Sequence, residues 1–132
     1  MEAVKRLEII ADTYLSVNTP VQLALPALMR QRETIQHGIN DRLCENERLA
    51  HSLLEGQTAF RCTFPAGGWY LVLELPEGMD DERFALNLIN RRQVYVHPGC
   101  MFGFEPGYCL VVSLLAPPEE FAEGLRRILA PI

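Results

Sequence analysis

Lysine is almost absent from this chain of 132 residues, in which Lys5 is the only example. Enzymes that work through a Schiff base need a lysine amine held in a pocket. Lys5 lies in the first turns of a helical stretch of mixed polarity, and no pocket-forming sequence precedes it. The sequence therefore argues against covalent lysine chemistry in the isolated chain.

Long apolar runs and a surplus of basic residues are also missing, and no leader sequence is predicted. No apolar run approaches the roughly 20 residues that a membrane span requires. Charges at Glu2, Lys5, Arg6 and Glu8 interrupt the N-terminus, so no signal peptide is predicted. A net charge of −5 argues against nucleic acid or an anionic membrane surface as the main partner. We expect a cytoplasmic protein that binds neither.

The cysteines and histidines do not follow metal-binding spacings. The chain has no C-x-x-C pair and no Cys/His spacing of the zinc type. His37 and His51 are too far apart for an i, i+4 pair on one helix. We therefore expect no metal site, and reduced, mostly buried thiols, as is usual in the cytoplasm. The four thiols belong to Cys44, Cys62, Cys100 and Cys109.

The N-terminal half is predicted to be helical. Residues 2–11 have a short apolar face, and a stretch without helical period follows. Thr19 is predicted to cap a second helix, with Pro20 at its first position. Pro26 should bend or restart that helix because proline removes a backbone donor. Residues 27–55 then repeat apolar positions every three, four or seven residues, which predicts the longest helix.

The C-terminal half alternates short strands and helices. Apolar residues alternate along 69–75 and 108–114, as in half-buried strands. In the second of these, Val111 falls on the less apolar face. Together with the long helix, the pattern predicts an α+β domain in which helices pack on a small mixed or antiparallel sheet. Its elements are strands at 59–64 and 69–75, a helix from Asp80 or Asp81 to Arg92, strands at 94–96 and 108–114, and a final helix opened by 117–120.

Several segments occur in an order and spacing typical of one enzyme family. They are Asp12–Leu28, Ile39–Leu43, Phe64–Tyr70, Val96–Gly103 and Leu110–Ser113. Together they resemble the C-terminal, small domain of class I/II pyridoxal-phosphate aminotransferases and the long helix that leads into it. The resemblance covers essentially the whole chain. It implies a long interdomain helix followed by β-β-α-β-β-α.

The resemblance also implies how the chain is divided and what the intact parent protein does. Residues 1–28 would be a remnant of the large domain with its connecting segment, and 29–132 the small domain. The parent would use pyridoxal phosphate to move an amino group between an amino acid and a 2-oxo acid, as a homodimer. This chain would lack the N-terminal large domain with the catalytic lysine. It would therefore hold no cofactor, metal or catalytic residue of its own and would be inactive alone.

Two positions are implied to line the substrate pocket or the dimer interface. Asn18 lies in the loop that, in the family, approaches the active site of the neighbouring subunit. Val111 occupies the position, two residues before Ser113, where members carry an arginine that binds the substrate carboxylate. A bidentate arginine cannot be replaced by valine. The parent would then bind that carboxylate with another cation, or use a substrate that lacks it.

The remaining candidates have structural interpretations. His97 has no acidic partner nearby in the sequence, so a structural strand-end histidine is predicted rather than a catalytic base. Trp69 and Tyr70 are predicted to be core or interface aromatics. Two other classes of protein stay open: the aminotransferase-like effector domain of a bacterial transcription regulator, and an oligomerisation module without chemistry.

Overall fold

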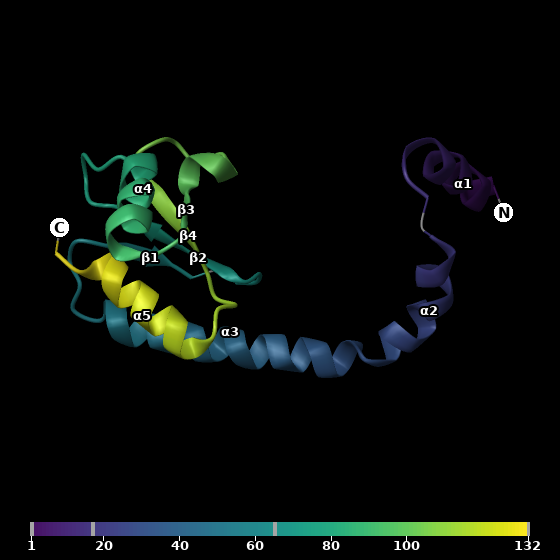
Figure 1. Cartoon of the computed structure of the whole chain (residues 1–132), viewed down its shortest axis with the longest axis horizontal. Helices are drawn as coiled ribbons and strands as arrows, with labels where there is room; N and C mark the ends of the chain where they lie inside the picture. The colour runs from purple at the N-terminus through teal and green to yellow at the C-terminus, as the bar shows by residue number, and fades with distance from the viewer. Residues whose placement is uncertain (1, 17, 65, 132) are drawn as a thin grey trace. The chain divides into compact units, whose positions relative to one another are not determined.

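The computed structural model describes residues 2–16, 18–64 and 66–131. The chain divides into two compact units, Met1–His37 and Gly38–Ile132, a boundary later than the sequence-based division at residue 28. Figure 1 labels the elements. In order they are α1 (Glu2–Tyr14), α2 (Thr19–Arg30), α3 (Arg32–Leu54), β1 (Arg61–Thr63), β2 (Tyr70–Glu74), α4 (Asp81–Arg92), β3 (His97–Pro98), the 3-10 helix η1 (Gly99–Phe102), β4 (Cys109–Ser113) and α5 (Pro118–Leu129).

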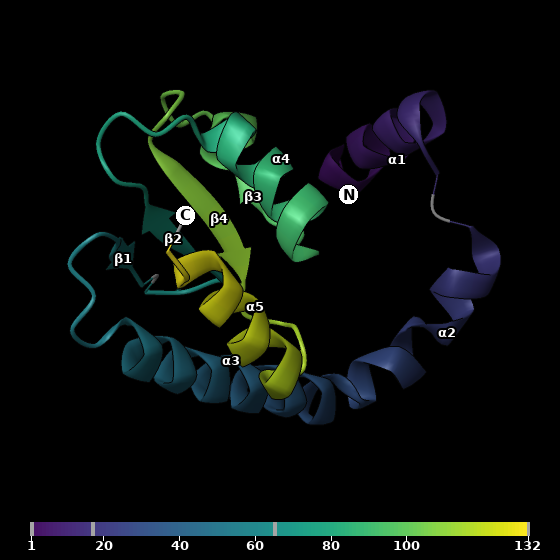
Figure 2. The ribbon, with the colours of Figure 1, turned by 60° about the vertical axis from the view of Figure 1, so that its left-hand side comes forward.

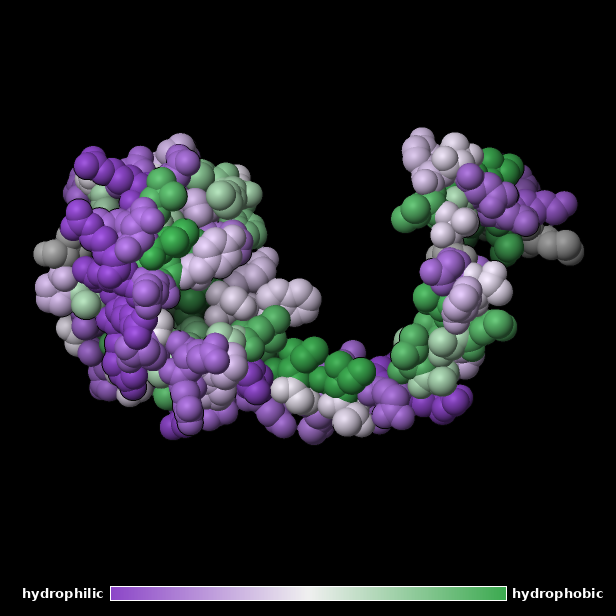
Figure 3. All heavy atoms as spheres, in the orientation of Figure 1, coloured by the Kyte–Doolittle hydropathy of each residue, from purple (hydrophilic) through white to green (hydrophobic). Residues whose placement is uncertain are grey.

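The N-terminal unit corrects three predicted helix boundaries. α1 continues past residue 11 to Tyr14. Asn18, not Thr19, is the N-cap of α2, because its side-chain oxygen accepts a hydrogen bond from Val21 N at 3.0 Å. α2 also runs through Pro26 and ends at Arg30, so the expected break comes later. In Figure 3, apolar side chains, in green, gather on the surface of α2.

The sheet of the C-terminal unit is antiparallel throughout, in the order β1-β2-β4-β3. β4 is a central strand, as its apolar alternation predicts. The strand predicted at 94–96 is wrong, since only His97 and Pro98 pair with β4. Val94 and Val96 are buried, but they form no rung of the ladder. Gln93, with φ at 54°, turns the chain just before them.

One face of the sheet carries the hydrophobic core. Figure 2 shows α4 and α5 in front of β4, and side chains of the C-terminal part of α3 join the same core. Asn46 on α3 donates from its amide nitrogen to the carbonyl oxygens of Leu114 and Ala116, at 2.7 and 2.8 Å. The fully buried apolar side chains at the centre are Leu71, Leu73, Leu88, Leu110, Leu125 and Ile128.

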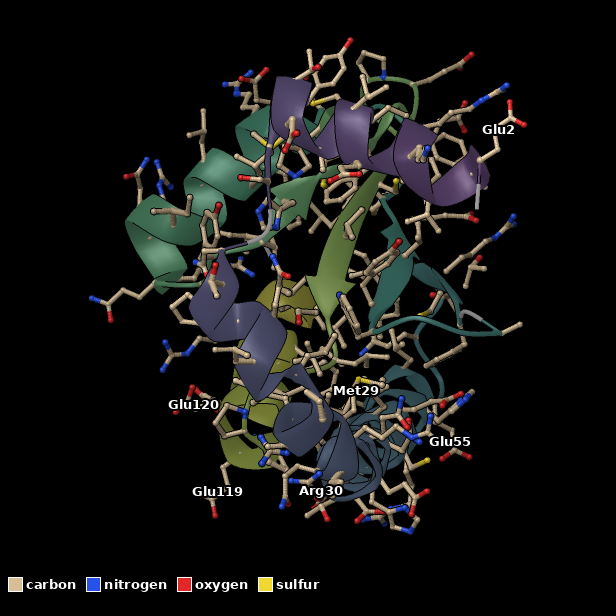
Figure 4. The ribbon with its side chains drawn as sticks, turned by 90° about the vertical axis from the view of Figure 1, so that its right-hand side faces the viewer. Glu2, Met29, Arg30, Glu55, Glu119 and Glu120 are labelled. Atoms are coloured by element: carbon tan, nitrogen blue, oxygen red, sulfur yellow. The ribbon has the colours of Figure 1, made fainter. Side chains whose placement is uncertain are left out.

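Hydrogen bonds join the C-terminal ends of α4 and α5. The guanidinium of Arg92 donates to the carbonyl oxygens of Arg127, Ala130 and Pro131, and Arg127 Nη1 donates to the carbonyl of Arg92 at 3.1 Å. Cations at helix C-termini are stabilising because the last carbonyls lack helical partners. Arg92 and Arg127 therefore connect the C-terminal ends of α4 and α5 at the surface. At the other end of α5, Glu119 and Glu120 point into solvent from the first turn (Figure 4).

Candidate functional site

The second face of the sheet, opposite the core, carries the position singled out in the sequence. Val111 is 4 % exposed, yet it lies outside the core cluster that contains Leu110 and Val112. It is paired with Val72 on β2 and with His97 on β3. Directly opposite residues in an antiparallel sheet point to the same face, so these three side chains form one row. Val111 is thus at the centre of this second face.

Aromatic rings gather beside this row. The Tyr95 hydroxyl lies 3.1 Å from His97 Nε2, and the two rings meet edge to face with centroids 4.9 Å apart. The ring of Phe102 stands at 89° to that of His97, with centroids 5.8 Å apart. The Tyr70 ring lies 6.3 Å from Phe102. We call Tyr70, Tyr95, His97 and Phe102 the ring cluster; Trp69, next to it in sequence, is 52 % exposed and lies outside the core.

Asp81 positions the part of the ring cluster that comes from η1. Its fully buried carboxylate accepts hydrogen bonds from Cys100 N at 3.1 Å and Gly107 N at 3.0 Å, and from the adjacent Glu82 N at 2.9 Å. Asp80 caps α4, by accepting from Arg83 N at 2.7 Å. The sequence did not distinguish these two neighbours. A helix has one N-cap, so of the adjacent Asp80 and Asp81 only one could cap α4. The presence of two aspartates was therefore a sequence signal that the second has a separate role.

The two predicted site residues belong to different units. Asn18 is in the N-terminal unit, and its amide oxygen is engaged in capping α2. Val111 is in the C-terminal unit, where it is buried in the sheet face. Their proposed roles at a pocket or interface stay predictions. Ser113 accepts a hydrogen bond from Leu115 N at 3.2 Å through its hydroxyl, which is a structural contact.

A groove of about 440 Å³ lies between α5 and the segment that precedes β3, and Tyr95 is the one member of the ring cluster that lines it. Val94, Val96, Val112 and Phe121 give it an apolar floor, while Glu120 and Glu123 stand on its lining. The guanidinium of Arg127 donates to Glu123 and lowers the pKa of that carboxyl. Across the described ranges 2–16, 18–64 and 66–131, no group of three or more His, Cys, Asp or Glu residues is placed to hold a metal ion.

The four thiols are free and differ in exposure. Cys44 is exposed, contrary to the expectation of mostly buried thiols, while Cys62 and Cys100 are partly buried and Cys109 is buried. Burial, together with the charge of Glu74, raises the pKa of Cys62 to about 11. Burial first, and Asp81 second, also raise the pKa of Cys100 and of Cys109. None of these three thiols is activated as a nucleophile, because the thiolate is the reactive form.

We expect iodoacetamide at pH 8 to alkylate Cys44 well before Cys62. With a pKa of about 11, Cys62 has roughly one thiolate per thousand molecules at that pH. Its rate should rise about tenfold per pH unit until the pH nears its pKa. The stabilising contribution of the neutral Cys62 thiol is present below its ordinary pKa of 9.0 and is lost as the pH rises through 11. Peptide mass spectrometry measures the alkylation rates of Cys44 and Cys62. Equal rates at pH 8 would contradict the raised pKa of Cys62. As a control, Cys62→Ser should remove the slow alkylation of that peptide and leave the alkylation of Cys44 unchanged.

Similarity to known proteins extends over nearly the whole chain. The sequence profile of the family Aminotransferase class I and II matches residues 2–128. No curated protein sequence matches the chain. No helix within the described part of the chain has the length and apolar character that crossing a membrane demands.

Solved structures of aminotransferases have the same fold. A probable N-succinyldiaminopimelate aminotransferase from Thermus thermophilus is 28 % identical, with a TM-score of 0.72, over 97 % of this chain and 34 % of its own. LysN, an α-aminoadipate aminotransferase also from Thermus thermophilus and solved with N-(5'-phosphopyridoxyl)-L-leucine, is 22 % identical, with a TM-score of 0.69 and the same coverage. An aminotransferase from Staphylococcus aureus is 24 % identical, with a TM-score of 0.67, over 80 % of this chain and 28 % of its own.

These matches confirm the expected small-domain architecture of helices on a small antiparallel sheet. The chain spans only about a third of the length of the two Thermus enzymes, 34 % of each. Since the family profile matches residues 2–128 of 132, the chain belongs to the class I and II aminotransferases, a family of pyridoxal-phosphate-dependent enzymes.

Proposed function

We propose that this chain acts as the small domain and interdomain helix of an aminotransferase that moves an amino group between an amino acid and a 2-oxo acid. The observation that carries the proposal is the match over 97 % of this chain to 34 % of a Thermus aminotransferase. The rest of such an enzyme would be supplied by residues beyond those of this chain. The enzyme would work in the cytoplasm.

The residues of this chain do not fit a complete pyridoxal phosphate site. When bound in such an enzyme, the cofactor supplies the electron sink for amino transfer, and a lysine holds it. Lys5 is exposed on the surface of α1, outside any cavity described above. We therefore assign the cofactor to the intact enzyme and no step of its chemistry to this chain.

The contribution we assign to this chain is mechanical. The second sheet face would form a wall of the substrate site, in which the ring cluster excludes water from the reacting groups. Exposed apolar side chains of the N-terminal unit would pack against other parts of the enzyme or a second subunit, because contiguous apolar patches favour association. Asn18, at the N-terminus of α2, would lie near that dimer contact. The most exposed of these apolar residues are Val4, Leu7, Ile9, Tyr14, Leu15 and Leu23.

The isolated chain should neither bind pyridoxal phosphate saturably nor transfer amino groups, and Lys5→Ala should change neither result. Visible absorbance of the cofactor and an amino-transfer assay with mixed amino acids measure these properties. A hybrid in which this chain replaces the C-terminal third of the probable N-succinyldiaminopimelate aminotransferase should bind the cofactor and transfer amino groups. Saturable binding by the chain alone that is lost in Lys5→Ala would overturn the proposal. A folded, cofactor-bound hybrid without amino transfer would also overturn it.

A further inference from the structure

His97 is the only ionisable side chain in the row of the second sheet face that contains Val111. The row runs from Thr63 through Val72 and Val111 to His97, as the strand register shows. His97 is the β3 residue that pairs with Val111, and its side chain is half-buried. A ligand lying on this face over Val111 would therefore meet one ionisable group from this row.

The two ring nitrogens of His97 differ in their hydrogen-bond partners. Nε2 lies 3.1 Å from the Tyr95 hydroxyl, and the Phe102 ring meets the imidazole at 89°. Nδ1 has no hydrogen-bond partner among residues 2–16, 18–64 and 66–131. Protonated imidazole donates from both nitrogens. One N–H would then point to the Tyr95 oxygen, and Nδ1–H would be available to an acceptor.

We propose that His97, oriented by Tyr95, binds the carboxylate of an amino-acid or 2-oxo-acid substrate. It would take the role of the arginine that the family resemblance implies at the position of Val111. The inference rests on the proposed function, which supplies the class of ligand. A hydrogen bond between imidazolium and carboxylate is charge-assisted and about twice as strong as a neutral one.

The charges around His97 suit an anion. Glu74, the acid on this sheet face, lies two strands from β3, and Arg61 on β1 is its neighbour in the strand register. Asp81, on α4, already accepts three backbone hydrogen bonds. α4 also carries Glu82, together with Arg83, Arg91 and Arg92, so its basic side chains outnumber its acidic ones. Burial raises the pKa of Cys100 on η1 and of Cys109 on β4, which keeps both thiols uncharged near neutral pH.

The test is a proton and nitrogen NMR titration of the full chain with and without excess 2-oxoglutarate, at constant ionic strength. His37 and His51, in the same molecule, are internal controls. Binding to the charged form should raise the pKa of His97 by about 0.5 or more, a roughly threefold preference, and leave the other two unchanged. Equal changes at all three histidines, or none at His97, would overturn the proposal. An equal effect of inorganic phosphate would overturn the assignment to carboxylates.

Two variants separate positioning from general destabilisation. Tyr95→Phe removes only the hydroxyl that orients the ring, so it should reduce the effect of 2-oxoglutarate on the pKa of His97. Tyr108→Phe makes the same change at another exposed tyrosine and should leave that effect intact. If both variants behave alike, Tyr95 is not a positioning residue. This NMR readout needs neither cofactor nor turnover, so its outcome is independent of the hybrid enzyme that tests the proposed function.

Discussion

Asn46→Asp should lower the free energy of unfolding of the C-terminal unit by about 3–5 kcal/mol. Asn46 is fully buried, and its amide nitrogen donates to the carbonyls of Leu114 and Ala116. A carboxylate cannot donate, so both carbonyls would face a negative charge at hydrogen-bond distance. Asn46 Oδ1 has no hydrogen-bond partner among the described residues. The hydrogen-bond contribution of this side chain to stability therefore comes from the two bonds that its amide nitrogen donates, and both are lost in the variant. Urea denaturation followed by circular dichroism measures the change.

The pH dependence and a matched control sharpen this test. The new carboxyl would be buried beside two carbonyls, which raises its pKa in the folded state above the unfolded value. Protonation should therefore restore part of the stability, so the deficit relative to wild type should be smaller at pH 4 than at pH 7. Asn40→Asp makes the same change on the exposed face of α3 and should cost less than about 0.5 kcal/mol. Equal losses for the two variants would contradict the role assigned to Asn46.

Gly99→Ala should destabilise the same unit by about 2–3 kcal/mol and disturb the ring cluster. A Cβ at position 99 would lie 2.5 Å from Cys109 Sγ, 3.1 Å from the Cys109 carbonyl oxygen and 3.2 Å from Phe104 Cβ. Cys109 belongs to the central strand β4 and is buried, so η1 must move instead. Phe102 lies on η1, and its contact with His97 should weaken. Denaturation, together with the chemical shifts of the His97 ring, measures both effects.

The steric origin of this effect can be checked with a second substitution. In a Cys109→Ala background the Sγ atom is gone, so Gly99→Ala should cost at least about 1 kcal/mol less than it does in wild type. Gly124, on α5, has no atom within 4 Å of an added Cβ. Gly124→Ala should therefore leave stability unchanged or raise it by up to about 1 kcal/mol. Additive effects of the Gly99 and Cys109 substitutions would rule out the close approach as the cause.

Local patterns in the sequence predicted the order of the elements because each pattern reflects neighbours along the chain. Alternation along 108–114 predicted the central strand β4, and it placed Val111 on the face opposite Leu110 and Val112. Pro118 and the acids after it predicted the start of α5. The sequence also predicts a helix end at Gly56 and a turn at Gly67 and Gly68, because glycine tolerates a positive φ. Gly56 and Gly68 have a positive φ, whereas Gly67 does not. The turn expected at 65–68 includes Pro65, which lies outside the described residues.

The contacts that hold the C-terminal unit together are made between residues distant in the sequence. Asn46 and Leu114, Arg92 and Arg127, and Asp81 and Gly107 meet only after the sheet and helices have packed. The strand expected at 94–96 fails for the same reason: an apolar run becomes a strand only where a neighbouring strand offers a ladder, and β4 offers it to His97 and Pro98. Sequence alone determined the family, the element order and the face of Val111. Only the tertiary structure decided that His97 stands beside Val111, because strand register is set by packing across the sheet.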